Sequence, residues 1–174
     1  MRHIRLQYCS CHCQLDRHCD AALLNSIHVI RRLSPKQAAN YDVFMTFDDV
    51  TVLDALLAAG QRVQSAFAGA SDPEGALRSA HEFLANALGH HPDDARLLTA
   101  LGAVACDRGQ HEQALAPLRR ALALGSRDKN AYFNLGVALI NLSEPARAKT
   151  AFTRACALSA LSCTWEAYFD PQAH

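Results

Sequence analysis

The chain has no net charge and no long apolar run, and each of these features excludes a class of protein. Lys plus Arg and Asp plus Glu number 17 each, so the formal net charge is zero. Surfaces that bind nucleic acid or anionic membranes need clustered positive charge, so we expect neither as a partner. No apolar run approaches the roughly 18 residues of a spanning helix. Polar residues interrupt the stretch 21–30, which makes it a poor signal-peptide core, and we expect a cytoplasmic protein.

The sequence also lacks the motifs that would indicate an enzyme. It has no Gly-rich phosphate loop, no G-x-S-x-G, no H-E-x-x-H and no pair of C-x-x-C motifs. His90 and His91 beside Pro92 indicate a solvated turn, because a metal site needs further ligands around one point. We therefore predict no catalytic residues, no metal and no cofactor.

Residues 1–44 differ from the rest of the chain. They hold Cys9, Cys11, Cys13 and Cys19, and no helical or strand period persists there. Three interpretations stay open: a disordered leader, a metal or redox site that uses the Cys/His run, and upstream sequence preceding a true start at Met45. The alternating cysteines argue against zinc, whose paired cysteines are usually two to four residues apart. We place the folded domain at 45–174.

From Thr46 onward the pattern becomes helical. Thr46 is a candidate helix cap, and apolar residues recur at three- and four-residue spacing up to Phe67. Asp72-Pro73 starts the next helix, since proline is tolerated in a first turn. Ser143 is a candidate cap ahead of Pro145. The helical spacing, together with a hydrophobic content of 50%, predicts an all-α domain. We expect helices near 74–89, 94–107, 111–124, 128–141 and 145–158.

A repeat with a period of 34 residues organises the region 95–162. Residues 61–94 extend it backwards, with matches such as Ala80/Ala114 and Leu84/Leu118. A fixed period of this size is typical of stacked supersecondary units. Seven identical pairs are separated by the period: Leu101/Leu135, Gly102/Gly136, Ala114/Ala148, Arg120/Arg154, Ala121/Ala155, Ala123/Ala157 and Leu124/Leu158.

These residues resemble the tetratricopeptide repeat (TPR) family. The first helix of a unit carries a Leu-Gly pair, and the second carries a small, a large and a small residue at intervals of four and three. The resemblance implies units at 61–94, 95–128 and 129–162, stacked as a right-handed α-solenoid. The family's closing proline matches Pro92 but is Ser126 and Ala160 in the later units, and the first unit has Phe67-Ala68 for Leu-Gly. Repeat arrays need an atypical end unit, so we predict a C-terminal capping helix over 163–169.

In the TPR family, the first helices line a concave groove that holds a peptide of a partner protein. Carried over to this sequence, the resemblance implies the following groove positions: Arg62, Ser65, Arg96, Thr99, Ala103, Cys106, Asp107, Asn130, Phe133, Asn134, Val137, Ile140 and Asn141. Phe133 is the aromatic residue of this set, so we take it as the apolar anchor. Some of these residues have a second interpretation, which is packing against the C-terminal helix.

We therefore expect a protein-interaction module that binds another protein or a peptide segment, as a monomer or weak homodimer. A TPR subclass that binds chaperone carboxyl termini uses lysines and an arginine in its groove. The matching positions here are Ser65, Gly69, Ala100, Asn130 and Asn134, which lack the lysines and the arginine, so we do not expect this role. The size and repeat number also resemble bacterial secretion chaperones, and this stays a narrower hypothesis. The alternative class is a metal-binding or redox protein that uses the N-terminal Cys/His run.

Overall fold

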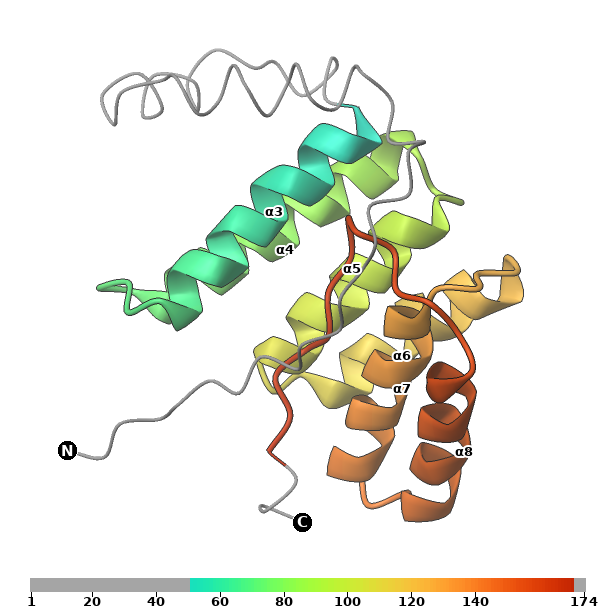
Figure 1. Cartoon of the computed structure of the whole chain (residues 1–174). Helices are drawn as coiled ribbons and strands as arrows, with labels where there is room; N and C mark the ends of the chain where they lie inside the picture. Colours follow the sequence, from blue (N-terminus) through green and yellow to red (C-terminus); the bar gives the residue numbers. More distant parts are fainter. Residues whose placement is uncertain (1–50, 171–174) are drawn as a thin grey trace, which may run out of the picture. The chain divides into compact units, whose positions relative to one another are not determined.

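A computed structural model describes residues 51–170, and this part of the chain is all-helical (Figure 1). The predictions for 1–44, the domain boundary at 45 and the helix start at Thr46 lie outside these residues. None of the helices in 51–170 is both long and apolar enough to cross a membrane. The described residues form six α-helices and no strand: α3 Val52–Phe67, α4 Pro73–His90, α5 Ala95–Asp107, α6 His111–Ala123, α7 Lys129–Asn141 and α8 Pro145–Cys156.

The helices begin where the sequence offers caps. The side chain of Thr51 accepts the backbone N–H of Asp54, and Asp72 accepts that of Gly75 ahead of α4. Asp94 and Asp128, one period apart, cap α5 and α7 in the same way. Each cap satisfies backbone N–H groups that have no partner within the helix. The expected helices from residue 74 onward are confirmed, each within two residues of its predicted ends.

The helices pack as three successive pairs. α3 packs on α4, α5 on α6 and α7 on α8, and the first helix of the middle pair, α5, contacts both α3 and α7. The predicted small-large-small positions of the second helices form the contact within each pair. Ala114, Leu118 and Ala121 of α6 are fully buried, and their counterparts in α4 and α8 are buried or, at Phe152, half-buried.

The first pair departs from the 34-residue period. Gly109 and Ser143, which have φ values of 70° and 61°, end equivalent first helices one period apart. Gly69, with φ 95°, occupies the corresponding turn after α3. It lies 40 residues before Gly109 instead of 34, mainly because α4 has 18 residues whereas α6 has 13. The period therefore holds for the second helix of the first pair and fails for α3. The expected Ser143 cap is wrong, since Ser143 occupies this turn and α8 begins after Glu144 without a side-chain cap.

The predicted C-terminal capping helix over 163–169 is also wrong. Residues 159–170 contain no helix. Pro171 would limit a helix to about two turns, which is too short to be stable alone. Thr, Trp, Tyr and Phe also favour extended backbone. The segment instead makes a turn at 162–163 and then continues without helix or strand, and side chains of α5 and α7 provide hydrogen bonds to its backbone.

The glycines at the helix contacts yield a stability prediction. A Cβ at Gly102 would lie 2.4 Å from Cγ of Leu118, and one at Gly136 would lie 2.6 Å from Phe152. Leu118 is fully buried and has no room to move. We expect Gly102→Ala to lower the free energy of unfolding by about 1–3 kcal/mol through overpacking, as measured by urea denaturation followed by circular dichroism.

Gly89 of α4 provides the matched control, because a Cβ there meets no atom within 4 Å. Gly89→Ala should leave stability unchanged or raise it by about 0.5–1 kcal/mol, since alanine favours a helix over glycine. Equal destabilisation by the two substitutions would contradict the close helix contact at Gly102.

Candidate functional site

The segment after α8 lies across the first helices of the pairs. We call residues 159–169 the tail segment, and the surface of α3, α5 and α7 that it contacts the covered face. In Figure 1 the tail segment is the red tube that leaves α8 and crosses α5. Its side chains join two apolar clusters, one built mainly from α3, α4 and α5 and the other from α5, α6 and α7.

Asp128, the cap of α7, anchors the beginning of the tail segment. Its Oδ1 accepts the N–H of Asn130 at 3.0 Å and that of Leu161 at 3.1 Å. Its Oδ2 accepts the hydroxyl of Thr164 at 2.6 Å, and this same hydroxyl accepts Nδ2 of Asn130 at 2.9 Å. Asp128 is 2% exposed, so these bonds are shielded from water and also compensate the burial of its carboxylate.

Asn134 of α7 holds the middle of the tail segment by its backbone. Its Nδ2 donates to the carbonyl of Trp165 at 2.9 Å, and its Oδ1 accepts the N–H of Ala167 at 2.8 Å. The side chain is fully buried. An amide side chain that both donates and accepts can replace the neighbouring strand that an extended backbone would otherwise need. This geometry is a means of binding extended chain.

Apolar side chains of the tail segment fill the covered face. Trp165 packs against both clusters and reaches α3, where it lies 3.8 Å from the position of a Cβ on Gly60. Ala167 is 4% exposed within the second cluster. Tyr168 stacks on Phe67 with ring centres 6.1 Å apart, and Phe169 lies 5.8 Å from Phe152. The segment therefore spans three helix pairs.

Asp107, at the end of α5, is the acid of the site whose pKa is raised. Its Oδ1 accepts the N–H of Tyr168 at 2.8 Å. Burial raises the pKa of its carboxyl to about 6, although the Tyr168 N–H and the Trp165 side chain counteract this rise. Burial likewise raises the pKa of the neighbouring Cys106 thiol to about 12, so this thiol stays neutral.

The sequence-derived positions divide into three groups. Asp107, Asn130 and Asn134 hydrogen-bond the tail segment directly. Ala103, Cys106, Phe133 and Val137 belong to the apolar cluster that includes Ala167. Phe133 packs edge-to-face on Phe152 at 5.5 Å, so it belongs partly to the core.

The third group does not contact the tail segment through any hydrogen bond. Arg96 pairs with Asp94, Thr99 donates to the Ala95 carbonyl and Asn141 donates to the Val137 carbonyl. Ile140 packs with the cluster between α7 and α8.

The two remaining positions, Arg62 and Ser65, are in α3, where the 34-residue period fails. Arg62 donates to Ser79 at 3.0 Å and its guanidinium lies 4.0 Å from the Phe83 ring centre, so it packs against α4. Ser65 is exposed.

Three residues of the site were not predicted from the sequence: Asp128, Thr164 and Trp165. Asp128 could be recognised as a helix cap, but its bonds to Leu161 and Thr164 depend on the path of the tail segment. Trp165 was placed on a helix, whereas it belongs to an extended segment.

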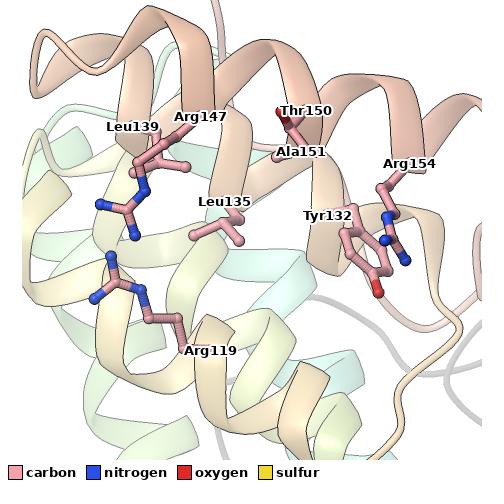
Figure 2. Close-up of a pocket in the computed structure, with 8 residues that line it drawn as sticks. All are labelled: Arg119, Tyr132, Leu135, Leu139, Arg147, Thr150, Ala151 and Arg154. Atoms are coloured by element: carbon pink, nitrogen blue, oxygen red, sulfur yellow. The ribbon is translucent and has the colours of Figure 1, made fainter.

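A shallow depression lies between α6, α7 and α8 (Figure 2). It measures about 250 Å³ and has an apolar floor that includes Leu135, Leu139 and Ala151. Arg119, Arg147 and Arg154 surround it, and the Arg119 and Arg147 guanidinium groups point toward one another (Figure 2). Within residues 51–170 no group of three or more His, Cys, Asp or Glu side chains could hold a metal ion. The cysteine-rich run 9–19 lies outside these residues.

A scan of the chain against protein-family models found no match, and a search of curated proteins found none of significance.

The two hydrogen bonds of Asn134 to the tail segment lead to a second prediction. Asn134→Ala leaves the Trp165 carbonyl and the Ala167 N–H without their partner, and a buried unsatisfied group costs about 1–3 kcal/mol. We expect the substitution to release the tail segment and shift the fluorescence of Trp165, the single tryptophan of the chain, toward that of a solvated indole. Asn141→Ala, which removes a bond within α7 only, should leave the spectrum unchanged. A buried Trp165 spectrum in both variants would contradict this role of Asn134.

The raised pKa of Asp107 generates a pH prediction. The folded protein favours protonated Asp107 more than the unfolded chain does, so this residue's contribution to stability falls as pH rises from about 4 through about 6. Asp107→Asn keeps an acceptor for the Tyr168 N–H and removes the buried charge. We expect the variant to be more stable than wild type at pH 7.5, by at most about 3 kcal/mol.

This advantage should shrink as pH falls toward 4, because the wild-type carboxyl then becomes protonated. Urea denaturation of both proteins across this range measures the difference. A constant difference would show that the Asp107 pKa is not raised in the folded protein.

Proposed function

We propose that this chain is a protein-interaction module of the TPR type, which binds an extended segment of a partner protein on the covered face. The supporting observation is the hydrogen bonding of Asn134 to the backbone of Trp165 and Ala167. The face binds extended polypeptide through groups that any sequence carries, and adjacent apolar positions add selectivity.

The placement of the site on α3, α5 and α7 supports the TPR interpretation. These are the first helices of the three pairs, and α5 contacts both neighbours. In a right-handed solenoid of TPR units, first helices line the concave side, where the TPR resemblance expects a peptide. Asn130 and Asn134, two positions carried over from that family, are among the residues that hold the tail segment.

The chemistry of the face favours a protein partner over a small substrate. Its polar groups are spaced along α5 and α7 and contact successive residues of one chain, instead of converging on a point as an active site requires. With a formal net charge of zero, we assign the chain to adaptor or chaperone-like proteins of the cytoplasm. The bacterial secretion chaperones, which hold a segment of a secreted partner, are the narrower candidate within this class.

Site-specific photocrosslinking tests this proposal. A photoreactive amino acid is placed at Phe67, which lies beside the tail segment and is 56% exposed, and the protein is added to native cell extract. The matched control is Leu124, which follows α6 and is 45% exposed. We expect a discrete protein adduct from position 67 and none of the same mass from position 124. Adducts that are identical at the two positions, or absent from position 67, would contradict binding at the covered face.

A further inference from the structure

We propose that the tail segment is a displaceable internal ligand, and that the partner binds as an extended segment of the same pattern: a hydroxyl residue, tryptophan, any residue, a small residue and two aromatics. This inference rests on the proposed function and names the chemistry of its partner. The pattern corresponds to Thr164, Trp165, Glu166, Ala167, Tyr168 and Phe169. Each position except that of Glu166 is selected by contacts on the covered face.

The first position selects a hydroxyl group. Oδ2 of Asp128 accepts a hydrogen bond from the Thr164 hydroxyl at 2.6 Å, and Nδ2 of Asn130 donates one to the same hydroxyl at 2.9 Å. A serine or threonine can donate and accept in this way at once, whereas an aliphatic side chain would leave both buried partners unsatisfied. Thr164 is 8% exposed, so water is largely kept from them.

The Asn134 bonds fix the register of the bound segment. They engage the carbonyl of the tryptophan and the N–H of the small residue, two positions later. Ala167 then falls against Val137, Ala103 and Cys106 in the second apolar cluster. A larger side chain would overpack this buried position.

The aromatic positions span the width of the face. Trp165 fills the space between the two clusters and reaches Gly60, while Tyr168 stacks on Phe67. Glu166 is exposed and its carboxylate pairs with Lys129 at 2.6 Å. An exposed ion pair contributes little, so this position tolerates other residues.

The tail segment fits the face imperfectly, which makes its displacement feasible. Oδ1 of Asn130 is buried and forms no hydrogen bond within residues 51–170, and the buried Oδ2 of Asp107 has only a poorly aligned hydrogen bond from Nε1 of Trp165. The tail segment itself contains no helix or strand, and Tyr168 near its end is 66% exposed. Unsatisfied buried groups are costly, so a segment that satisfies them competes well.

Tethering makes the tail segment the default occupant. A segment joined to its own site by a short linker acts at an effective concentration on the order of millimolar. An external segment of equal fit therefore displaces the tail segment only above roughly millimolar concentration, and one that fits better, or that meets a weakened tail segment, binds at lower concentration. Partner binding is thus an exchange, and it exposes the thiol of Cys163, which is half-buried while the tail segment is docked.

A labelled peptide of residues 158–170 in which Cys163 is replaced by serine tests the exchange on the full chain. Fluorescence anisotropy measures its affinity for wild type and for the Trp165→Ala chain, whose own tail segment is weakened. We expect at least tenfold tighter binding to the Trp165→Ala chain, and at least a tenfold loss when the peptide carries Ala167→Leu. Equal affinity of the peptide for the two chains, or equal affinity of the two peptides, overturns the proposal.

Alkylation of the wild-type chain tests the exchange without any substitution. Saturating peptide should accelerate alkylation of Cys163 at least fivefold and leave that of exposed Cys156 unchanged, as resolved by mass spectrometry. An unchanged Cys163 rate overturns the proposal. A concentration-dependent wild-type dimer in which Cys163 stays protected would also overturn it, because the face would then hold the tail segment of a second copy.

The outcomes separate this inference from the proposed function. Peptide exchange without a partner adduct at position 67 would leave an internal ligand on a face with no partner, and the proposed function would fail. A partner adduct without peptide exchange would leave the proposed function standing and refute the partner pattern.

Discussion

The pair of hydrogen bonds between Asn134 and the backbone of the tail segment is the constraint on which the rest of the site depends. It ties one buried side chain to the carbonyl of Trp165 and the N–H of Ala167, and so leaves a single register for the extended chain. In an extended segment successive side chains alternate in direction. A slip by one residue would bring Glu166 to the buried position of Ala167, and the cost of burying a carboxylate there opposes it.

Asp128 couples this register to the fold itself. The carboxylate that starts α7 also receives the Leu161 N–H and the Thr164 hydroxyl. A helix cap contributes about 1 kcal/mol in general, and here the same group serves two further donors. Displacing the tail segment thus leaves the cap of α7 in place while freeing part of its carboxylate. The site on α7 can remain folded whether or not the tail segment occupies it.

The sequence predicted the helices well because their determinants are local. The helix start at Asp72-Pro73 and the buried positions of the second helices follow from short-range spacing, and the structure confirms them. The 34-residue period did not locate the equivalent positions in α3, because the extra length of α4 does not interrupt the helical spacing of its apolar residues. The tail segment was predicted as a helix since its aromatics also fit a helical face. Its true conformation depends on Asn134 and Asp107, which are about 30 or more residues away.

The polarity of α8 explains why the tail segment is free to lie on the covered face. A stack of helix pairs needs a polar outer surface at its end. α8 buries Ala148, Ala151 and Ala155 against its neighbours and exposes residues such as Lys149, Thr153 and Arg154. It therefore ends the stack without a further helix, so the residues after it are not required as a cap. Their apolar side chains instead cover the first helices, where Trp165 and Ala167 shield an apolar surface that would otherwise meet water. An exposed surface of that kind is typical of interaction sites. A segment that shields it while Oδ1 of Asn130 stays without a hydrogen bond within residues 51–170 is better suited to exchange than to permanent packing.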